Sequence, residues 1–161
     1  MDKKVIIITD REGREERIKE IILNRKIYAV VLRSVKDVKS ASKKLKSFCE
    51  KHDVLLLAHS DHRSIKFCDG IHLNSKAKSI SEIRKEFGSD IVIGYSSHSV
   101  DEARKALSDG ANYVFLSPVL KSKYEGIKPM GVEAFNKAAV QIGEGVFALG
   151  GVNKNLSLIH I

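Results

Sequence analysis

The sequence predicts an α/β protein whose parallel strands and helices alternate along one continuous domain. Two observations support this fold class: short apolar, β-branched runs recur along the chain, and amphipathic segments separate them. The runs are continuous rather than alternating, which is typical of parallel strands covered on both faces. They are Val5–Thr9, Tyr28–Leu32, Val54–Ala58, Gly70–Leu73, Asp90–Gly94, Tyr113–Leu116 and Val146–Leu149.

Three of the segments between these runs have helical periodicity, with one apolar stripe and charged residues opposite. Gly88 and Gly110 follow two of them, at the position where a helix commonly ends in the left-handed conformation. Ser99 precedes the third, and Glu102 follows three residues later, which predicts a capping box. The predicted helices are Val38–Cys49, Ile80–Phe87 and Val100–Leu107.

Seven strand–helix units without a break in composition favour a closed (β/α)8 barrel, or TIM barrel, over an open sheet. The segment Thr9–Gly13, after the first run, has no dinucleotide-binding glycine pattern, which also disfavours an open doubly wound sheet. Such barrels have about 250 residues and at least about 200, whereas this chain has 161. We therefore expect an incomplete barrel, with seven strands present and the eighth unit missing, in a single domain over residues 1–155.

The last six residues, 156–161, are expected to be a non-native tail. Leu-Ser-Leu-Ile-His-Ile equals the in-frame translation of CTG-TCT-CTT-ATA-CAC-ATC, the transposon end used as a sequencing-library adapter. This segment also falls where a helix is expected to begin, after Gly150–Asn153. A short natural tail is the alternative.

Composition narrows the classes of partner. The formal net charge is +8, but lysines such as Lys36 and Lys39 lie at helical spacing, which usually indicates a solvated helix face. No aromatic residues interleave with the basic ones, so we expect no nucleic-acid binding, and an anionic small molecule fits the charge equally well. No apolar run approaches the roughly 20 residues of a membrane helix, and no signal peptide is recognised. Cys49 and Cys68 have no motif spacing, which is typical of thiols in a reducing compartment. We expect a cytoplasmic protein; its oligomeric state stays open.

The most specific segment is Ile93–Ala103, which reads Ile-Gly-Tyr-Ser-Ser-His-Ser-Val-Asp-Glu-Ala. It resembles, without a gap, the I-G-x-S-T-H-S-x-E-E-A segment of the thiamine phosphate synthase and thiazole tautomerase family. Other segments resemble family motifs in the same order, and the resemblance covers residues 5–155. The chain is thus identified as a divergent, C-terminally truncated member. The other segments are Ile8–Arg11 (I-T-D-R), Asp69–Leu73 (D-G-V-H-L), Gly110–Val114 (G-A-D-Y-V), Ser117–Val119 (G-P-V) and Ala148–Val152 (A-I-G-G-I).

The resemblance implies a transferase of thiamine biosynthesis that joins hydroxymethylpyrimidine diphosphate to thiazole phosphate and releases pyrophosphate with Mg²⁺. Barrel enzymes hold their sites at the C-terminal ends of the strands, so we expect the phosphates there. Arg33 ends the second run, where a guanidinium can bind a diphosphate through two hydrogen bonds. Ser96 ends the fifth strand, where its hydroxyl can donate to the leaving pyrophosphate. These two are the candidate catalytic residues; a solvated arginine and a hydroxyl bonded to local backbone are the alternatives.

Further substrate-binding candidates follow other strands. Gly150 and Gly151 would let backbone amides approach a phosphate closely, and a tight turn without a ligand is the alternative. Ser122 and Lys123 are the nearest equivalents of the family's T-x-T-K, whose lysine meets the diphosphate. His59, at the end of the third strand, completes the predicted substrate-binding set.

Two more histidines lie in family motifs. We expect His72, which is surrounded by apolar residues within a strand, to be a core residue rather than a catalytic one. We expect His98 to orient its loop rather than to carry protons.

The departures from the family concern the metal. The third strand of the family ends in N-D, whose aspartate binds Mg²⁺; here the positions hold His59 and Ser60, with Asp61 one place later. A second metal-binding aspartate is replaced by Ala77. Because Mg²⁺ relies on one or two carboxylates together with substrate phosphates, only Asp61 remains as a candidate ligand. The tautomerase branch uses a histidine where this chain has Ser117.

Three functions therefore stay open. The first is a divergent synthase. The second is a catalytically degenerate barrel that binds a thiazole or thiamine phosphate. The third is a thiazole tautomerase-like isomerase, which would need another acid–base residue such as His59 or His98 facing the pocket.

Overall fold

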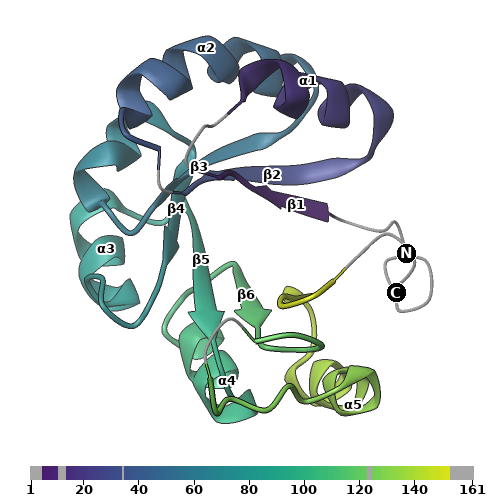
Figure 1. Cartoon of the computed structure of the whole chain (residues 1–161). Helices are drawn as coiled ribbons and strands as arrows, with labels where there is room; N and C mark the ends of the chain where they lie inside the picture. The colour runs from purple at the N-terminus through teal and green to yellow at the C-terminus, as the bar shows by residue number, and fades with distance from the viewer. Residues whose placement is uncertain (1–4, 11–13, 34, 123–124, 153–161) are drawn as a thin grey trace. The chain divides into compact units, whose positions relative to one another are not determined.

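The computed structural model describes residues 5–10, 14–33, 35–122 and 125–152 (Figure 1). The chain divides into two compact units, residues 1–92 and 93–161, and each is considered by itself. The strands follow one another in sequence order from β1 to β7. The pairings within each unit are parallel, as the continuous apolar runs predicted.

In the first unit, three helices and a short 3-10 helix connect the parallel strands (Figure 1). Its elements are β1 (Val5–Ile8), α1 (Glu15–Asn24), β2 (Ile27–Leu32), α2 (Val38–Lys51), β3 (Leu55–His59), η1 (His62–Phe67), β4 (Gly70–Leu73) and α3 (Ile80–Phe87). The second unit continues the alternation. Its elements are β5 (Val92–Ser97), α4 (Val100–Ser108), β6 (Tyr113–Leu116), α5 (Val132–Ile142) and β7 (Val146–Ala148). No helix among these described residues is long and apolar enough to cross a membrane.

These seven parallel strands confirm the predicted strand–helix alternation. The largest correction concerns the fifth strand, which runs from Val92 to Ser97 rather than from Asp90 to Gly94. The polar residues at its end stay in the strand because the Ser97 hydroxyl donates a hydrogen bond to the carbonyl oxygen of Phe115 on β6, at 2.7 Å. The three predicted helices are present, and α1 and α5 are additional to them.

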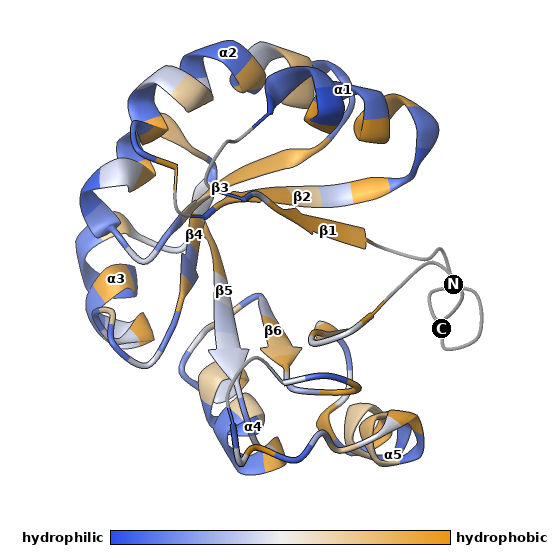
Figure 2. Ribbon diagram, viewed as in Figure 1, coloured by the Kyte–Doolittle hydropathy of each residue, from blue (hydrophilic) through white to orange (hydrophobic). Residues whose placement is uncertain are grey.

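The core of the first unit lies between its helices and one face of the strands. Ile18 and Ile22 of α1 and Leu45 of α2 pack there against Val30 and Leu32 of β2. Figure 2 shows the same division: β1 to β3 are mostly apolar, whereas α1 and α2 carry polar residues on much of their surface. Since side chains alternate along a strand, Val31 of β2 and Arg33, the residue that follows the strand, face away from the helices.

The motif Asp69–Leu73 has an architectural role at the start of β4. Asp69 Oδ2 accepts a hydrogen bond from the Leu56 amide at 2.9 Å, and its Oδ1 pairs with Lys46 Nζ at 2.5 Å. A Cβ on Gly70 would lie 1.9 Å from the carbonyl oxygen of Val92, so no larger residue fits without moving backbone. The motif therefore fixes how β4 sits against its neighbours.

In the second unit, a glycine makes room for an aromatic ring. A Cβ on Gly94 would lie 2.1 Å from the ring of Tyr113, which is its register partner on β6. Tyr113, Phe115 and Phe147 form a cluster of edge-to-face rings. A separate cluster under α5 contains Leu116, Val119, Phe135 and Ala138.

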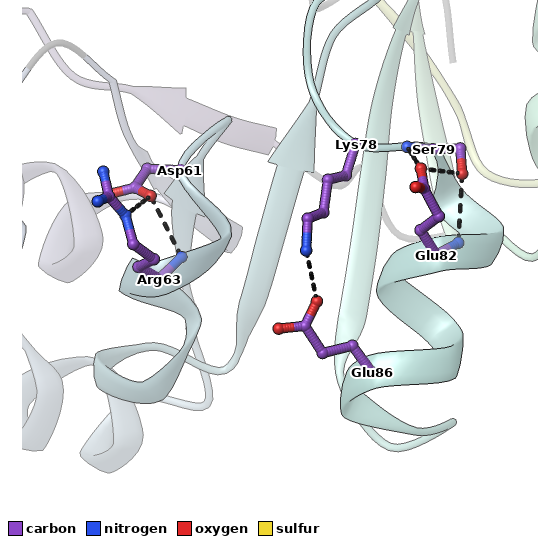
Figure 3. A network of polar contacts seen from close by, with 6 residues as sticks. All are labelled: Asp61, Arg63, Lys78, Ser79, Glu82 and Glu86. Atoms are coloured by element: carbon purple, nitrogen blue, oxygen red, sulfur yellow. Dashed lines mark hydrogen bonds and ion pairs between the residues drawn. The ribbon is translucent and has the colours of Figure 1, made fainter.

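The capping box predicted at Ser99 is only half formed. The Ser99 hydroxyl accepts from the Glu102 amide at 3.1 Å, but the Glu102 carboxylate accepts from the amide of His98, one residue earlier than predicted. The reciprocal box occurs instead at the start of α3, between Ser79 and Glu82 (Figure 3). Gly88 and Gly110 have φ of 83° and 104°, which confirms the predicted left-handed residues beyond α3 and α4.

Candidate phosphate-binding site

A row of three basic side chains crosses the C-terminal ends of β2, β3 and β4. His59 and His72 are register partners on β3 and β4. Arg33 stands at the level of His59, because each follows directly after the paired residues Leu32 and Ala58. The row lies on the strand face turned away from the helices. Arg33 is exposed, His59 is half-buried and His72 is buried.

Two hydrogen bonds hold the main chain of Arg33 in place directly after β2. Its amide donates to the carbonyl oxygen of Val31 at 2.9 Å, and its own carbonyl accepts from the Thr9 hydroxyl at 3.0 Å. These contacts use only main-chain atoms of Arg33. Its guanidinium has no ion pair with any of the described carboxylates.

Burial and positive charge keep both imidazoles of the row neutral. Burial, with smaller contributions from His59 and Arg33, lowers the pKa of His72 from 6.5 to about 3. Burial and then the charge of Arg33 also lower the pKa of His59. Near pH 7 the charge of the row therefore resides on Arg33. The expectation that His72 is a core residue is confirmed by its burial.

A cavity of about 470 Å³ opens beside this row, between the loop after β2 and the loop after β3. His59 is one of its lining residues, which places this predicted substrate-binding residue at a strand end with open space beside it. Pockets that hold small molecules in proteins have about 300–1,000 Å³. The wall combines apolar and charged side chains and consists of Leu32, Val35, Lys36, Asp37, Val38, Lys39, His59, Asp61, Ser64 and Phe67.

Asp61, the one predicted metal ligand, is engaged in local contacts (Figure 3). Its Oδ1 accepts from the amide of Arg63 at 3.2 Å and from Arg63 Nε at 3.1 Å, and its Oδ2 accepts from the Ser64 hydroxyl at 3.1 Å. Slight burial acts to raise the pKa of Asp61, but these hydrogen bonds and the charge of Arg63 together lower it. Asp61 is thus the N-cap of η1.

The position of the family's metal-binding aspartate holds Ser60, which has an unusual environment. Its φ is 60°, a left-handed conformation that aspartate and asparagine adopt more readily than serine does. Its hydroxyl is buried and has no hydrogen-bond partner among the described residues. Of the two positions where the family carries a metal-binding aspartate, this chain therefore has Ser60 at one and Ala77 at the other, and neither supplies a carboxylate.

The second unit contains Ser96 and His98. Ser96 is one residue short of the end of β5, rather than at its end, and pairs in register with Phe115. Its role at the leaving pyrophosphate stays a prediction. The Nδ1 atom of His98 lies 3.1 Å from the Ser117 carbonyl oxygen, which supports the expectation that His98 orients its loop.

The two glycines after β7 are explained by contacts with the loop after β6. Gly150 and Gly151 have φ of 96° and 77°, and a Cβ on either would lie 2.8 Å from atoms of Lys121. The Gly150 carbonyl accepts from the amides of Leu120 and Lys121. A tight approach of two loops thus requires both glycines, and phosphate binding by them stays a prediction.

The remaining predicted residues follow in the loop after β6. Ser122 is half-buried, whereas Lys123 lies outside the described residues, as does the tail 156–161. The prediction that Arg33 shares one mouth with Ser96 and the glycines spans the two units and stays a prediction. Sequence reasoning missed Lys36 and Lys39, which line the cavity and were assigned to a solvated helix face. The sequence did contain a signal that could have identified them: both lie a few residues after Arg33, beyond the end of a parallel strand.

Solved structures establish the fold. The thiamine phosphate pyrophosphorylase from Pyrococcus furiosus superposes with a TM-score of 0.80 at 22% identity, over 95% of this chain and 77% of that one. The fold and the site together define a protein of parallel β/α units of the TIM-barrel kind, with basic side chains at strand ends. This confirms the predicted α/β fold of the TIM-barrel kind, with seven strands among the described residues.

The family follows from the sequence comparisons. The profile of the thiamine monophosphate synthase family matches residues 5–157, and the chain belongs to this family. A thiamine-phosphate synthase of Halalkalibacterium halodurans is 29% identical over 164 aligned residues, 94% of this chain and 77% of that protein. One of Prochlorococcus marinus is 34% identical over 118 residues, 71% of this chain but only 34% of that protein. These identities agree with a divergent member, and the relatives support the predicted role in thiamine biosynthesis.

Proposed function

We propose that this chain is a thiamine phosphate synthase-like transferase that joins hydroxymethylpyrimidine diphosphate to thiazole phosphate and releases pyrophosphate. The observation that carries the proposal is the position of Arg33 in a chain that matches the family over residues 5–157. Its guanidinium has no ion pair with the described carboxylates, and it stands level with His59, which lines the cavity. Phosphorylated small molecules are accordingly the expected partners.

In this proposal each residue has a role that follows from its position in the chain. Arg33 binds the diphosphate, and the neutral imidazole of His59 forms the adjoining wall of the cavity. Ser96 donates a hydrogen bond to the departing pyrophosphate. Ser122, Lys123, Gly150 and Gly151 bind phosphate at the ends of the later strands. The proposal places the protein in the cytoplasm, and the free thiols of Cys49 and Cys68 support a reducing compartment.

The direct test supplies both substrates to the purified chain and measures pyrophosphate release together with formation of thiamine phosphate. Reactions with either substrate alone are the control for hydrolysis of the diphosphate. The proposal expects product only when both substrates are present, and less product from the Arg33→Ala variant. Pyrophosphate release without coupled product would contradict it.

A second candidate function, a degenerate barrel that binds the phosphate ligands without reaction, is favoured by one observation. Ser60 replaces a metal-binding carboxylate, and Asp61 is engaged by Arg63. This candidate expects binding of thiazole phosphate or thiamine phosphate without turnover. Calorimetric binding beside the turnover assay separates it from the transferase.

The isomerase alternative depends on His98. The tautomerase branch has a histidine at the position of Ser117, and the His98 ring lies beside that residue, 3.3 Å from its hydroxyl. His59 is the other candidate acid–base residue, since it lines the cavity. Conversion of thiazole tautomers by the wild-type chain, lost in His98→Asn or His59→Asn, would support this alternative over the transferase.

A further inference from the structure

The cavity beside β2 and β3 has basic groups without acidic partners. Lys36 and Lys39 line it, and Arg33, which is not one of the lining residues, stands level with the lining residue His59. Neither lysine has an ion pair with any carboxylate in the described part of the chain. The Lys39 ammonium lies 5.9 Å from the ring centroid of Phe67, another residue of the wall, which places this charge at the cavity.

The two acidic side chains that line the same cavity, Asp37 and Asp61, both accept hydrogen bonds from nearby residues. Asp37 caps α2, with its Oδ1 accepting from the Ser40 amide at 3.0 Å. Asp61 is bound by Arg63 and caps η1. Arg63 balances the charge of Asp61, and in the described part of the chain no ion pair joins Asp37 or Asp61 to Lys36 or Lys39. The first amides of α2, at Val38 and Lys39, add the partial positive charge of a helix start on the same side.

The shape and chemistry of the wall suit an organic diphosphate. Leu32, Val35, Val38 and Phe67 provide apolar surface, whereas Lys36 stands in the loop after β2 and Lys39 in the first turn of α2. A diphosphate carries several negative charges that must be neutralised when it binds and when it leaves. Bound cations or fixed basic side chains can both supply that neutralisation.

We infer that Lys36, Lys39 and Arg33 bind the diphosphate group in this cavity without a divalent cation, so that fixed side-chain charges take the place of the metal ion. This inference rests on the proposed function and deepens it, since it names how the site holds its diphosphate. It agrees with the loss of the metal carboxylates at Ser60 and Ala77 and with the engagement of Asp61.

Calorimetric titration of the whole chain with inorganic pyrophosphate tests the inference, once with excess EDTA and once with excess Mg²⁺. We expect binding in EDTA that is at least as tight as in Mg²⁺. The Lys36→Ala/Lys39→Ala double variant should weaken binding in EDTA by about tenfold or more, because each lysine contributes a charge-assisted contact. Should the double variant fail to fold, as judged by circular dichroism, the two single variants give the same comparison.

The matched control is Lys43→Ala/Lys51→Ala, which removes the same charge from exposed positions of α2 away from the cavity. It should bind pyrophosphate within about twofold of the wild type, because these lysines make no direct contact. Binding that requires Mg²⁺, no binding under either condition, or equal losses in both double variants would overturn the inference.

The turnover assay keeps the two proposals distinguishable. Coupled product formation that depends on Mg²⁺, with no pyrophosphate binding in EDTA, would overturn this inference and leave the transferase intact. Metal-independent pyrophosphate binding without product would overturn the transferase and leave the diphosphate site in place.

Discussion

His59 and His72 lie side by side across β3 and β4, with ring centroids 6.0 Å apart and ring planes 16° from parallel. The charge of Arg33 acts on both rings. A histidine pair beside a guanidinium is stable only while the imidazoles remain neutral, because a proton on either ring would add a like charge in a buried place. The row therefore links the stability of the first unit to pH.

The first prediction concerns that link. An unfolded histidine takes up a proton near its ordinary pKa of 6.5, whereas folded His72 takes one up only near pH 3. The unfolded state then binds more protons between these values, so the free energy of unfolding is highest above the upper value and falls as the pH decreases toward the lower one. His72→Asn should flatten the pH dependence by up to about 1.4 kcal/mol per pH unit.

Urea unfolding of wild type and His72→Asn at several pH values checks this prediction. The informative range lies between about pH 5 and 6.5, above the range in which most carboxylates titrate. Parallel curves for the two proteins would contradict it.

The second prediction concerns Asp69, which anchors the start of β4. Asp69→Ala should lower the free energy of unfolding by about 1–3 kcal/mol, because the Leu56 amide loses its charged acceptor in a partly buried place. Lys46→Ala removes only a partly exposed ion pair and should cost under about 1 kcal/mol. Equal, small losses in both variants would show that the amide contact contributes little.

Much of the fold could be predicted from the sequence because parallel strands and capped helices have local signals. The helix α3 has a complete capping box at Ser79, and α4 has a capping serine at Ser99. The helices that were not predicted, α1 and α5, begin after Arg14 and Gly131, neither of which makes a side-chain cap. The end of β5 was missed since its serines are polar; the buried Ser97 is accommodated by a hydrogen bond from its hydroxyl to Phe115 of β6.

The third prediction concerns the contact between Gly94 and Tyr113. Gly94→Ala should destabilise the second unit by about 1–3 kcal/mol, since the new methyl group would overlap the tyrosine ring. Adding Tyr113→Leu should recover part of that loss, so that the double variant is more stable than the sum of the two single effects. Additive losses in a thermal unfolding series would contradict the proposed overlap.

Gly70→Ala provides the comparison. Its Cβ would meet the carbonyl oxygen of Val92, a backbone atom that no side-chain substitution can remove. We expect it to be at least as destabilising as Gly94→Ala and to have no rescue by shortening a neighbouring side chain.

The candidate site was less predictable than the fold. Which charged side chains can bind a ligand depends on which of them form ion pairs with other residues of the folded protein. Asp61 was selected as a metal ligand from its place in the sequence, yet Arg63, two residues later, engages its carboxylate. Lys36 and Lys39 were assigned to a solvated helix face, since lysines at such spacing usually are. Their place in the wall of the cavity distinguishes them from the lysines further along α2.

The fourth prediction concerns metal. In the absence of substrate, titration of the chain with Mg²⁺ should give no binding heat, and Asp61→Asn should behave like the wild type. The same substitution should weaken the cap of η1 and cost about 0.5–2 kcal/mol of stability. A Mg²⁺ titration that shows binding in the wild type and none in Asp61→Asn would instead restore Asp61 as a ligand.

The last prediction tests Arg33 directly. Arg33→Ala should weaken binding of hydroxymethylpyrimidine diphosphate by about tenfold or more, because a charge-assisted contact to a phosphate is lost. Binding of thiazole phosphate should change much less. Arg25→Ala is the matched control, since Arg25 is an exposed arginine at the end of α1 and is not among the residues that line the cavity. Titrations of both ligands into both variants decide the matter: an equal loss for the two ligands in Arg33→Ala would mean that Arg33 supports the strand end rather than the diphosphate.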